Sequence, residues 1–253
     1  RHENNQGTCF SEDEVLGLIR GEYIFKIASD DVIKGKDAIE LFHKFLSENA
    51  HYGLVAGDNE FIDKDSKKCL LDQDHNISYS KNNFNFDSFM RFILSKRPDI
   101  SIDSKDFGSY QSFLRGNYIT NAILLKREVY NKVPFYTKES PLEDWYLMLQ
   151  ISKKWKIKFF NKVTCSYRRH PVNTSANLSA MKVMSDKTRD YERFLLSKPE
   201  NSEYQSIARK FRIIKERGYF GLFKKVTYEN FYIRKKVLYL FYLIPFTLRS
   251  SSI

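Results

Sequence analysis

Residues 21 to 31 read Gly-Glu-Tyr-Ile-Phe-Lys-Ile-Ala-Ser-Asp-Asp, an apolar run that ends in two adjacent carboxylates. Apart from Lys26, the run from Tyr23 to Ala28 has the aromatic and β-branched composition that is typical of a strand. Because it is nearly continuous rather than alternating, it predicts a parallel strand buried on both faces. In open α/β sheets, ligands bind beyond the carboxyl ends of such strands, so Asp30 and Asp31 suit a divalent ion, Mg²⁺ or Mn²⁺. The alternative is an acidic turn that caps the next helix, and on this stretch alone the alternative is favoured.

The composition indicates an ordered protein with excess positive charge. Of 253 residues, 42% are hydrophobic, and the net charge of +11 favours polyanionic partners: nucleic acid, an anionic membrane or phosphorylated small molecules. The widely spaced cysteines, Cys9, Cys69 and Cys165, predict neither a zinc site nor a disulfide framework, and indicate a reducing compartment. The longest apolar stretch, Val237 to Leu248, contains Pro245 and falls short of the roughly 20 residues that span a bilayer. We therefore expect a cytoplasmic protein, soluble or at the cytoplasmic face of the inner membrane.

The expected elements alternate between strands and helices up to about residue 175, and an all-helical tail follows. The region 63–83 is polar and is expected to form turns and loops. The predicted helices are 11–20, 37–49, 84–94, 141–154, 176–196 and 203–217, and the predicted strands are 21–28, 52–62 (broken at Gly57 and Asp58), 116–125, 157–160 and 163–167.

Glu143 and Asp144 begin the predicted helix 141–154. The helix dipole stabilises ionised carboxylates there and is expected to lower their pKa. An ionised carboxylate beside a substrate hydroxyl can act as a general base. Simple complementarity to the dipole also explains the pair, and it is the better explanation of the pair alone. Trp145 is expected in the core or, beside an active site, stacked on a sugar ring.

His170 follows Arg168 and Arg169 after a predicted strand. Imidazole suits a metal site, and guanidinium groups bind phosphate oxygens in pairs. An exposed loop histidine after a solvated basic turn is the alternative.

Taken together, these motifs resemble family 2 glycosyltransferases, which have the GT-A fold. They occur in the family's order and spacing over roughly residues 3 to 175. The resembling segments are Gly21–Ile24 with Asp30-Asp31, Tyr52–Val55 with Phe61–Asp63, Gly116–Ile119, Leu142–Trp145, and Tyr167–His170 with Asn173–Ser175.

The resemblance implies a GT-A-like (Rossmann-like) mixed sheet flanked by helices and an inverting, metal-dependent sugar transfer. The implied cofactor is Mn²⁺ or Mg²⁺, and the implied donor is a nucleotide-sugar, with a UDP-sugar as the first candidate. The implied metal ligands are Asp30, Asp31 and His170, and the implied donor-binding residues are Asp30, Asp31, Gly116, Arg168 and Arg169. The implied catalytic residues are Asp144, the general base, and Glu143, which helps to orient the acceptor; Glu143 and Trp145 are the implied acceptor-binding residues.

Two departures from the family pattern stand out. Ala28 occupies the first acidic position of the D-x-D motif, so one nucleotide or ribose contact is in doubt. The segment Asn5-Gln6-Gly7 resembles the loop that follows two N-terminal strand–helix units of ~30 residues each. The sequence therefore predicts an N-terminally truncated domain with an exposed sheet edge.

The expected organisation is a partial GT-A-like domain over 1–175 and a helical, basic, aromatic-rich extension over 176–253. The expected activity is transfer of a sugar to a saccharide or lipid-linked acceptor in bacterial surface polysaccharide synthesis. One alternative is a non-catalytic scaffold subunit of the same fold. A second alternative, a nucleic-acid-binding protein, is supported only by the net charge, and no nucleic acid partner is expected. The segment 219–249 predicts either contact with an anionic membrane or a helical pair packed on the domain.

Overall fold

The computed structural model describes residues 3–4, 8–80, 85–133, 137–171, 173–219, 222–241 and 243–253. The chain forms two compact units, Arg1–Glu192 and Arg193–Ile253. The units divide after Glu192, whereas the sequence predicts a division after residue 175. The segment Asn5–Gly7, which resembles a family loop, lies outside the described residues.

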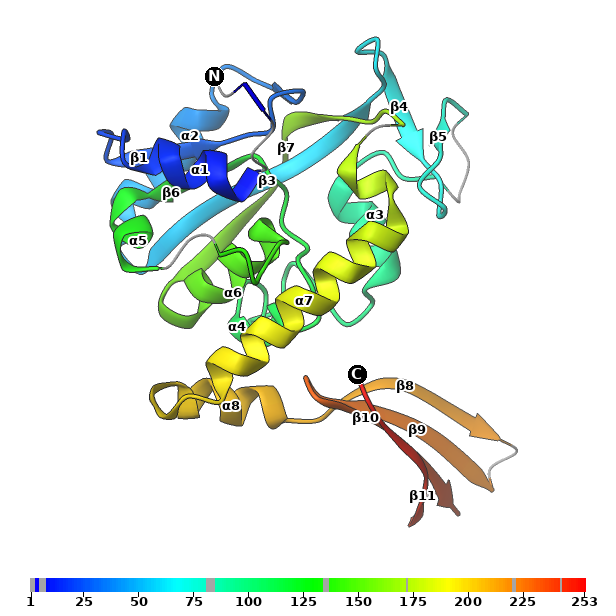
Figure 1. Ribbon diagram of the computed structural model, residues 1–253. Helices are drawn as coiled ribbons and strands as arrows, with labels where there is room; N and C mark the ends of the chain where they lie inside the picture. Colours follow the sequence, from blue (N-terminus) through cyan, green and yellow to red (C-terminus); the bar gives the residue numbers. More distant parts are fainter. Residues whose placement is uncertain are drawn as a thin grey trace. The chain divides into compact units, whose positions relative to one another are not determined.

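The first unit is built on a mixed sheet with β3 (Tyr52–Ile62) beside β7 (Lys156–Arg168) at its centre (Figure 1). These two strands are parallel, and nearly every residue of β3 is buried. The remaining pairings are antiparallel. Along the other edge of β3 lie β6 (Ile123–Lys126) and β4 (Lys68–Leu71); β1 (Tyr23–Lys26) pairs with β6, β5 (Ile77–Ser78) with β4, and β2 (Val32–Ile33) with β7.

Helices flank this sheet, which confirms the expected α/β architecture of a mixed sheet between helices (Figure 1). Phe42 of α2 (Ala38–Glu48) packs against Val55 on one face, together with Phe160. Phe159, the preceding residue of β7, contacts Phe107 instead. The other helices of the unit are α1 (Thr8–Leu16), α3 (Phe89–Lys96), α4 (Tyr110–Phe113), α5 (Arg127–Lys132), α6 (Glu143–Lys154) and α7 (Leu178–Leu196, whose last residues enter the second unit).

Four long elements match their predictions, one of them the helix predicted at 176–196, which is α7. The predicted helices 37–49 and 141–154 are α2 and α6, and the predicted strand 52–62 is β3. The expected break in that strand is wrong, because β3 runs through Gly57 and only its register with β7 shifts there. A Cβ at Gly57 would lie 2.3 Å from Oγ1 of Thr164, so glycine permits this close pairing of the two central strands.

The prediction for β1 is wrong in both burial and direction. β1 is half-buried, and it runs antiparallel to β6. Tyr23 and Phe25 pack against the core below α2, whereas Lys26 forms an ion pair with Glu12 of α1 at 3.1 Å. The apolar run reflects cover by helices rather than burial between two parallel strands.

Several boundaries also differ from their predictions. Only the end of 116–125 is a strand, because Asn117 closes a turn through its side chain onto Ile119. The predicted loop 63–83 contains β4 and β5 within its described part, and the predicted strands 157–160 and 163–167 form the single strand β7. The helices predicted at 11–20 and 84–94 are α1 and α3, shifted by several residues.

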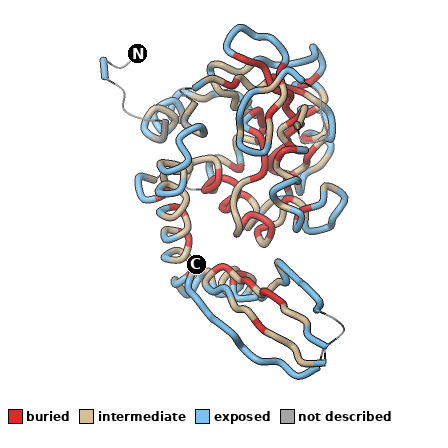
Figure 2. The backbone as a smooth tube through the Cα atoms, turned by 90° about the vertical axis from the view of Figure 1, so that its right-hand side faces the viewer, coloured by how far each residue is buried: buried red, intermediate tan, exposed pale blue. Residues whose placement is uncertain are grey.

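The prediction of an all-helical extension over 176–253 is wrong from Arg212 onward, where the second unit forms an antiparallel sheet, whereas α7 and α8 (Ser202–Arg209) are helices as predicted. After α8, the strands follow the order β11-β10-β9-β8 and pair with their neighbours along the chain. Burial is confined mainly to β9 and β10, and β11 is exposed throughout (Figure 2). The strands are β8 (Arg212–Tyr219), β9 (Phe223–Glu229), β10 (Ile233–Leu240) and β11 (Ile244–Ser252).

Local chemistry explains this sheet. Its segments are rich in tyrosine, phenylalanine, valine and isoleucine, which fit a pleated surface. Asn230 turns the chain between β9 and β10, since its side-chain oxygen accepts from the backbone N–H groups of Tyr232 and Ile233. Pro245 lies on the edge strand β11, where a missing N–H costs no ladder bond. Among the described residues, no helix is both long enough and apolar enough to cross a bilayer.

Candidate active site

The end of β7 meets the turn that follows β1. After this turn, β2 pairs with β7, with Val32 opposite Ser166. The backbone N–H of Arg168 donates to Oδ1 of Asp31 at 2.9 Å, and Nε2 of His170 lies 3.0 Å from Oδ2 of Asp30. The structure thus brings together the two carboxylates and the histidine that the sequence predicts as one site.

His170 lies between an acceptor and a donor. Its Nε2 is 3.0 Å from Oδ2 of Asp30 and 3.1 Å from Nδ2 of Asn173. The amide of Asn173 is oriented by its own oxygen, which accepts from the backbone N–H of His170 at 2.6 Å. Either protonation state of Nε2 therefore satisfies only one of its two neighbours. This is neither the exposed histidine nor the solvated turn of the alternative interpretation.

Asp31 is half-buried, and its burial changes the pKa of its carboxyl group. Its pKa is raised to about 6, because burial and the nearby charge of Asp30 together outweigh the hydrogen bond from Arg168 and the charge of Arg168. Its Oδ2 is buried and has no hydrogen-bond partner among the described residues. An acceptor oxygen held in this way is available to a ligand.

The two arginines are engaged by the protein itself. The guanidinium of Arg168 donates to the backbone oxygens of Asp30 at 2.8 Å and Asp63 at 2.9 Å. Arg169 is buried, and its Nη1 donates to Oγ of Ser175 at 2.7 Å. Arg168 thereby ties the acidic turn and the loop after β3 to the end of β7.

Asp144, in the first turn of α6, is held by the loop that precedes β6. Its Oδ2 accepts from Nδ2 of Asn117 at 2.8 Å, and its Oδ1 accepts from the backbone N–H of Trp145 at 2.7 Å. Gly116 has φ +124°, a conformation that side chains disfavour, and this turn directs Asn117 toward the helix. The predicted glycine loop therefore holds the predicted base in place through Asn117.

Trp145 is mainly a core residue. It is buried, and its Nε1 donates to the backbone oxygen of Phe113 at 2.7 Å. The guanidinium of Arg189 on α7 lies over its ring at 5.8 Å. The helix start is completed by Thr188 of α7, whose hydroxyl accepts from the backbone N–H of Leu142 at 3.1 Å. Two elements, α4 and α7, thus fix the start of α6.

Glu143 lies in a different environment from its neighbour. Its pKa is raised to about 7, because burial and the charge of Asp144 together outweigh the opposing charge of Lys26. The expectation that the helix dipole lowers the pKa is therefore wrong for Glu143. Removal of the carboxylate from water outweighs both the dipole and the lysine.

A pocket of about 460 Å³ joins residues that are distant in the sequence. Asp31, Gly116, Asp144 and Trp145 all line it, whereas the predicted site residues Glu143, Arg168 and Arg169 do not. Asp30 and His170 adjoin it only through their contacts beside Asp31. The other lining residues are Asn59, Phe89, Asn117, Ile119, Thr120, Asn121, Leu142, Tyr167, Ser175, Leu178, Met181, Lys182 and Ser185.

Sequence reasoning missed three contributions to this pocket. Asn117 carries the contact to Asp144, and Asn59 of β3 is buried with its Oδ1 unpartnered among the described residues. The third contribution is a wall formed by α7, which the sequence assigns to the extension. The sequence contains one sign of this wall. Leu178, Met181, Lys182 and Ser185 recur three and four residues apart, which places them on one face of a helix.

Within the described ranges, no three His, Cys, Asp or Glu side chains lie close enough to hold a metal ion by themselves. Asp30 and His170 form a pair, while one oxygen of Asp31 is already bound to a backbone N–H. Comparison of the sequence with protein-family models gives no match, and comparison with curated proteins finds no relative.

Proposed function

We propose that this chain is a GT-A-like glycosyltransferase of the family 2 type. It transfers a sugar from a nucleotide-sugar, with a UDP-sugar as the first candidate, to a saccharide or lipid-linked acceptor of a bacterial surface polysaccharide. The observation that supports this proposal is the convergence of Asp31 and Asp144 on one pocket. Metal-dependent sugar transfer needs carboxylates in two separate places. One set holds the metal ion at the leaving diphosphate, and the other carboxylate acts as the base at the acceptor hydroxyl.

Asp144 is the proposed general base. Its two oxygens each accept one hydrogen bond from the protein, which leaves further lone pairs on each oxygen for an acceptor hydroxyl. The acceptor oxygen attacks the anomeric carbon as the bond from that carbon to the diphosphate oxygen breaks. The hydroxyl proton passes to Asp144, and the bonding electrons leave with the nucleoside diphosphate.

Asp30 and His170 are the proposed ligands of the divalent ion, with Asp31 beside them. The contact of 3.0 Å between Oδ2 of Asp30 and Nε2 of His170 places one carboxylate oxygen and one imidazole nitrogen side by side, and both atom types would bind a divalent ion. Held by these residues, a divalent ion would supply positive charge for the leaving diphosphate. The unpartnered Oδ2 of Asp31 and the half-satisfied Nε2 of His170 support this assignment.

Arg168 is proposed to act by positioning the acidic turn rather than by holding the diphosphate directly. Its guanidinium already donates to three backbone oxygens and to the hydroxyl of Ser66. The same argument applies to Arg169, which is buried against Tyr167 and Ser175.

A non-catalytic scaffold subunit of the same fold is the second candidate. Two observations favour it: Ala28 replaces an acidic residue of the family motif, and the guanidinium groups of both arginines are engaged by the protein. The two candidates share the fold, and they differ in turnover of a nucleotide-sugar, which only the transferase requires.

Calorimetric titration with UDP in the presence of Mn²⁺, and again with a chelator, tests the nucleotide site. We expect Mn²⁺ to tighten UDP binding, and Asp30→Asn to weaken the metal-dependent binding about tenfold or more. Asp103→Asn, a change at an exposed aspartate outside the pocket, is the matched control. An affinity that is unchanged by the metal and by Asp30→Asn contradicts the assignment.

A further inference from the structure

The C-terminal sheet carries most of the net positive charge of the chain. Between Arg212 and Ile253 there are nine lysines and arginines against two glutamates, a formal charge of +7 out of the total of +11. Charge this concentrated on one small sheet raises the local concentration of anionic partners.

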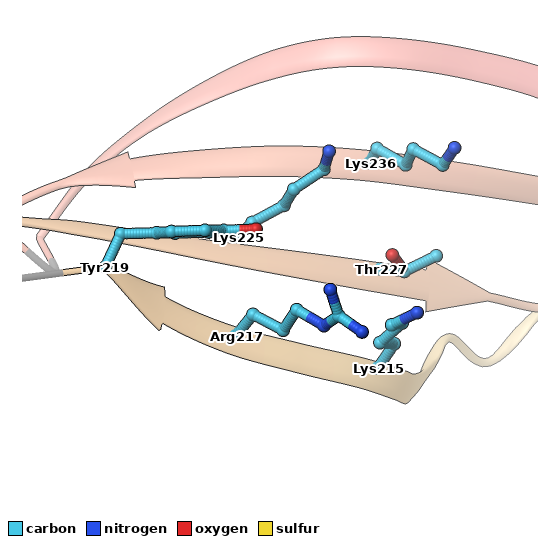
Figure 3. Close-up of a pocket in the computed structure, with 6 residues that line it drawn as sticks. All are labelled: Lys215, Arg217, Tyr219, Lys225, Thr227 and Lys236. Carbon is cyan, nitrogen blue, oxygen red and sulfur yellow. The ribbon is translucent and has the colours of Figure 1, made fainter.

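Much of this charge lies on one face of the sheet. Figure 3 shows Lys215 and Arg217 on β8, Lys225 on β9 and Lys236 on β10 as side chains around one shallow pocket. Cross-strand pairing places Arg249 of β11 opposite Lys236, on the same face. We call these five residues the basic face.

The basic face has no internal counter-charge. Glu216 pairs with Lys224 at 2.7 Å, and Glu229 pairs with Arg234. Those are the two glutamates of the sheet, and within the part of the chain that the structure describes no carboxylate pairs with the basic face. Its cations are therefore free for an external anion.

One end of the same sheet is apolar. The β8–β9 and β10–β11 hairpins both turn at this end, where the backbone N–H of Phe241 donates to the oxygen of Leu222 at 2.7 Å. The side chain of Leu243 is 80% exposed, the highest value among the exposed large hydrophobic residues described. The exposed apolar residues at this end, the tip residues, are Leu222, Phe223, Phe241, Leu243, Ile244 and Phe246.

The opposite end of the sheet is joined to the rest of its own unit. The backbone N–H of Phe231 donates to the oxygen of Ala208 in α8, and Arg193 donates to the backbone oxygens of Phe231 and Ile253. The tip residues thus project from the end that is not tethered by α8.

We propose that this sheet binds the surface of an anionic bilayer, with the tip residues in the interfacial layer and the basic face against lipid phosphates. Clustered exposed apolar side chains mark a partner surface, and apolar groups beside lysine and arginine suit the boundary between headgroups and acyl chains. Nucleic acid would use the basic face, and its bases can stack on phenylalanine, but it offers nothing to Leu222, Leu243 and Ile244, of which Leu243 is the most exposed. The inference concerns the second unit alone and does not rest on the proposed transferase activity.

Sedimentation of the full chain with vesicles tests this inference. We expect binding about tenfold tighter or more to an equal mixture of phosphatidylcholine and phosphatidylglycerol than to phosphatidylcholine alone. Lys215→Glu with Arg217→Glu should remove this preference. Lys36→Glu with Lys44→Glu reverses two exposed lysines of the first unit and is the matched charge control.

A second pair of variants tests the tip residues. Leu243→Trp should show a blue-shifted emission when anionic vesicles are added, and Leu243→Ser should weaken binding several-fold. Leu18 is 74% exposed in the first unit, so Leu18→Trp and Leu18→Ser are the matched controls and should match the parent protein. Circular dichroism confirms that each variant is folded.

Two outcomes overturn the proposal. One is the absence of an effect: the parent protein does not sediment with anionic vesicles, or the charge and tip variants bind these vesicles as tightly as the parent does. The other is tight, salt-sensitive binding to an oligonucleotide without vesicle binding, which would assign the basic face to nucleic acid.

Discussion

The carboxylate of Asp144 is fixed from two directions. The amide of Asn117 donates to one oxygen at 2.8 Å, and the backbone N–H of Trp145 donates to the other at 2.7 Å. Asn117 is itself oriented by the backbone N–H of Ile119. A base that must meet an acceptor hydroxyl at hydrogen-bond distance benefits from such constraint, because a small misplacement greatly slows proton transfer.

Asn117→Ala should lower kcat about tenfold while changing the KM for the donor little, because only the orientation of Asp144 is lost. Steady-state rates at saturating donor measure this split. Asn121→Ala is the matched control, because Asn121 lines the same pocket without a hydrogen bond to Asp144 among the described residues. Equal kcat losses in both variants, or none in Asn117→Ala, would show that this contact does not position the base.

Glu143 should make the stability of the fold depend on pH. Its pKa rises from 4.5 to about 7 on folding, because burial penalises the ionised form. Its contribution to stability is therefore complete below pH 4.5 and is lost as the pH rises through about 7. With allowance for partial exposure, the loss should be about 1–2 kcal/mol.

Glu143→Gln removes this titration. The unfolding temperature of the variant, measured against the parent protein with a chelator present, should rise between about pH 5 and about pH 8. Glu48→Gln replaces an exposed glutamate of α2, and its unfolding temperature should change with pH as that of the parent does. If the unfolding temperatures of Glu143→Gln and the parent differ by the same amount at every pH in this range, Glu143 ionises as freely in the fold as in water.

Helix α7 owes its place in the first unit to a buried polar cluster. Glu192, which is fully buried, accepts from the hydroxyl of Tyr110 at 2.5 Å and from Gln150 at 2.7 Å, and it pairs with Lys153 at 2.8 Å. The same helix caps α6 through Thr188 and lines the pocket. Loss of this cluster should therefore affect both stability and the site.

Glu192→Ala should lower the free energy of unfolding by about 3–5 kcal/mol, because it removes the buried carboxylate that balances the charge of the buried Lys153 ammonium. Denaturant titration measures the change, with Glu200→Ala at an exposed turn as the control. Glu192→Gln should cost less, since it keeps the shape and part of the hydrogen bonding. A loss below about 1 kcal/mol for Glu192→Ala would show that α7 is held chiefly by apolar contacts.

Elements with strong periodicity and clear ends could be predicted from the sequence. The strand β3 and the helices α2 and α6 match, because continuous burial and an apolar stripe leave few alternatives. The second unit could not be predicted, since its lysines, arginines and aromatic residues also suit a basic amphipathic helix. The hairpin turn at Asn230 was the local signal that favours strands.

The site was predictable only in part. The family resemblance implies that Asp30, Asp31 and His170 belong to one site, and the structure brings them together. Asn59 and the α7 wall depend on contacts between segments far apart in the chain, which periodicity does not encode. The buried environment of Glu143 likewise depends on tertiary packing and reverses the expected direction of its pKa.

The whole molecule combines an acidic pocket in its first unit with a basic sheet in its second. These features carry two separate proposals, transfer chemistry for the pocket and membrane contact for the sheet. Each can fail without the other, because vesicle binding requires no turnover and turnover of a soluble acceptor requires no vesicle.

The central claim is that Asp144 in this pocket catalyses sugar transfer. Its most direct test is release of nucleoside diphosphate from a panel of nucleotide-sugars with Mn²⁺, comparing the parent protein with Asp144→Asn and with the exposed control Asp65→Asn. We predict turnover of at least one donor by the parent and by Asp65→Asn, and a loss of about 10²–10⁴-fold in Asp144→Asn with donor binding retained. Undiminished release by Asp144→Asn, or no release by the parent from any donor that it binds, would contradict the account.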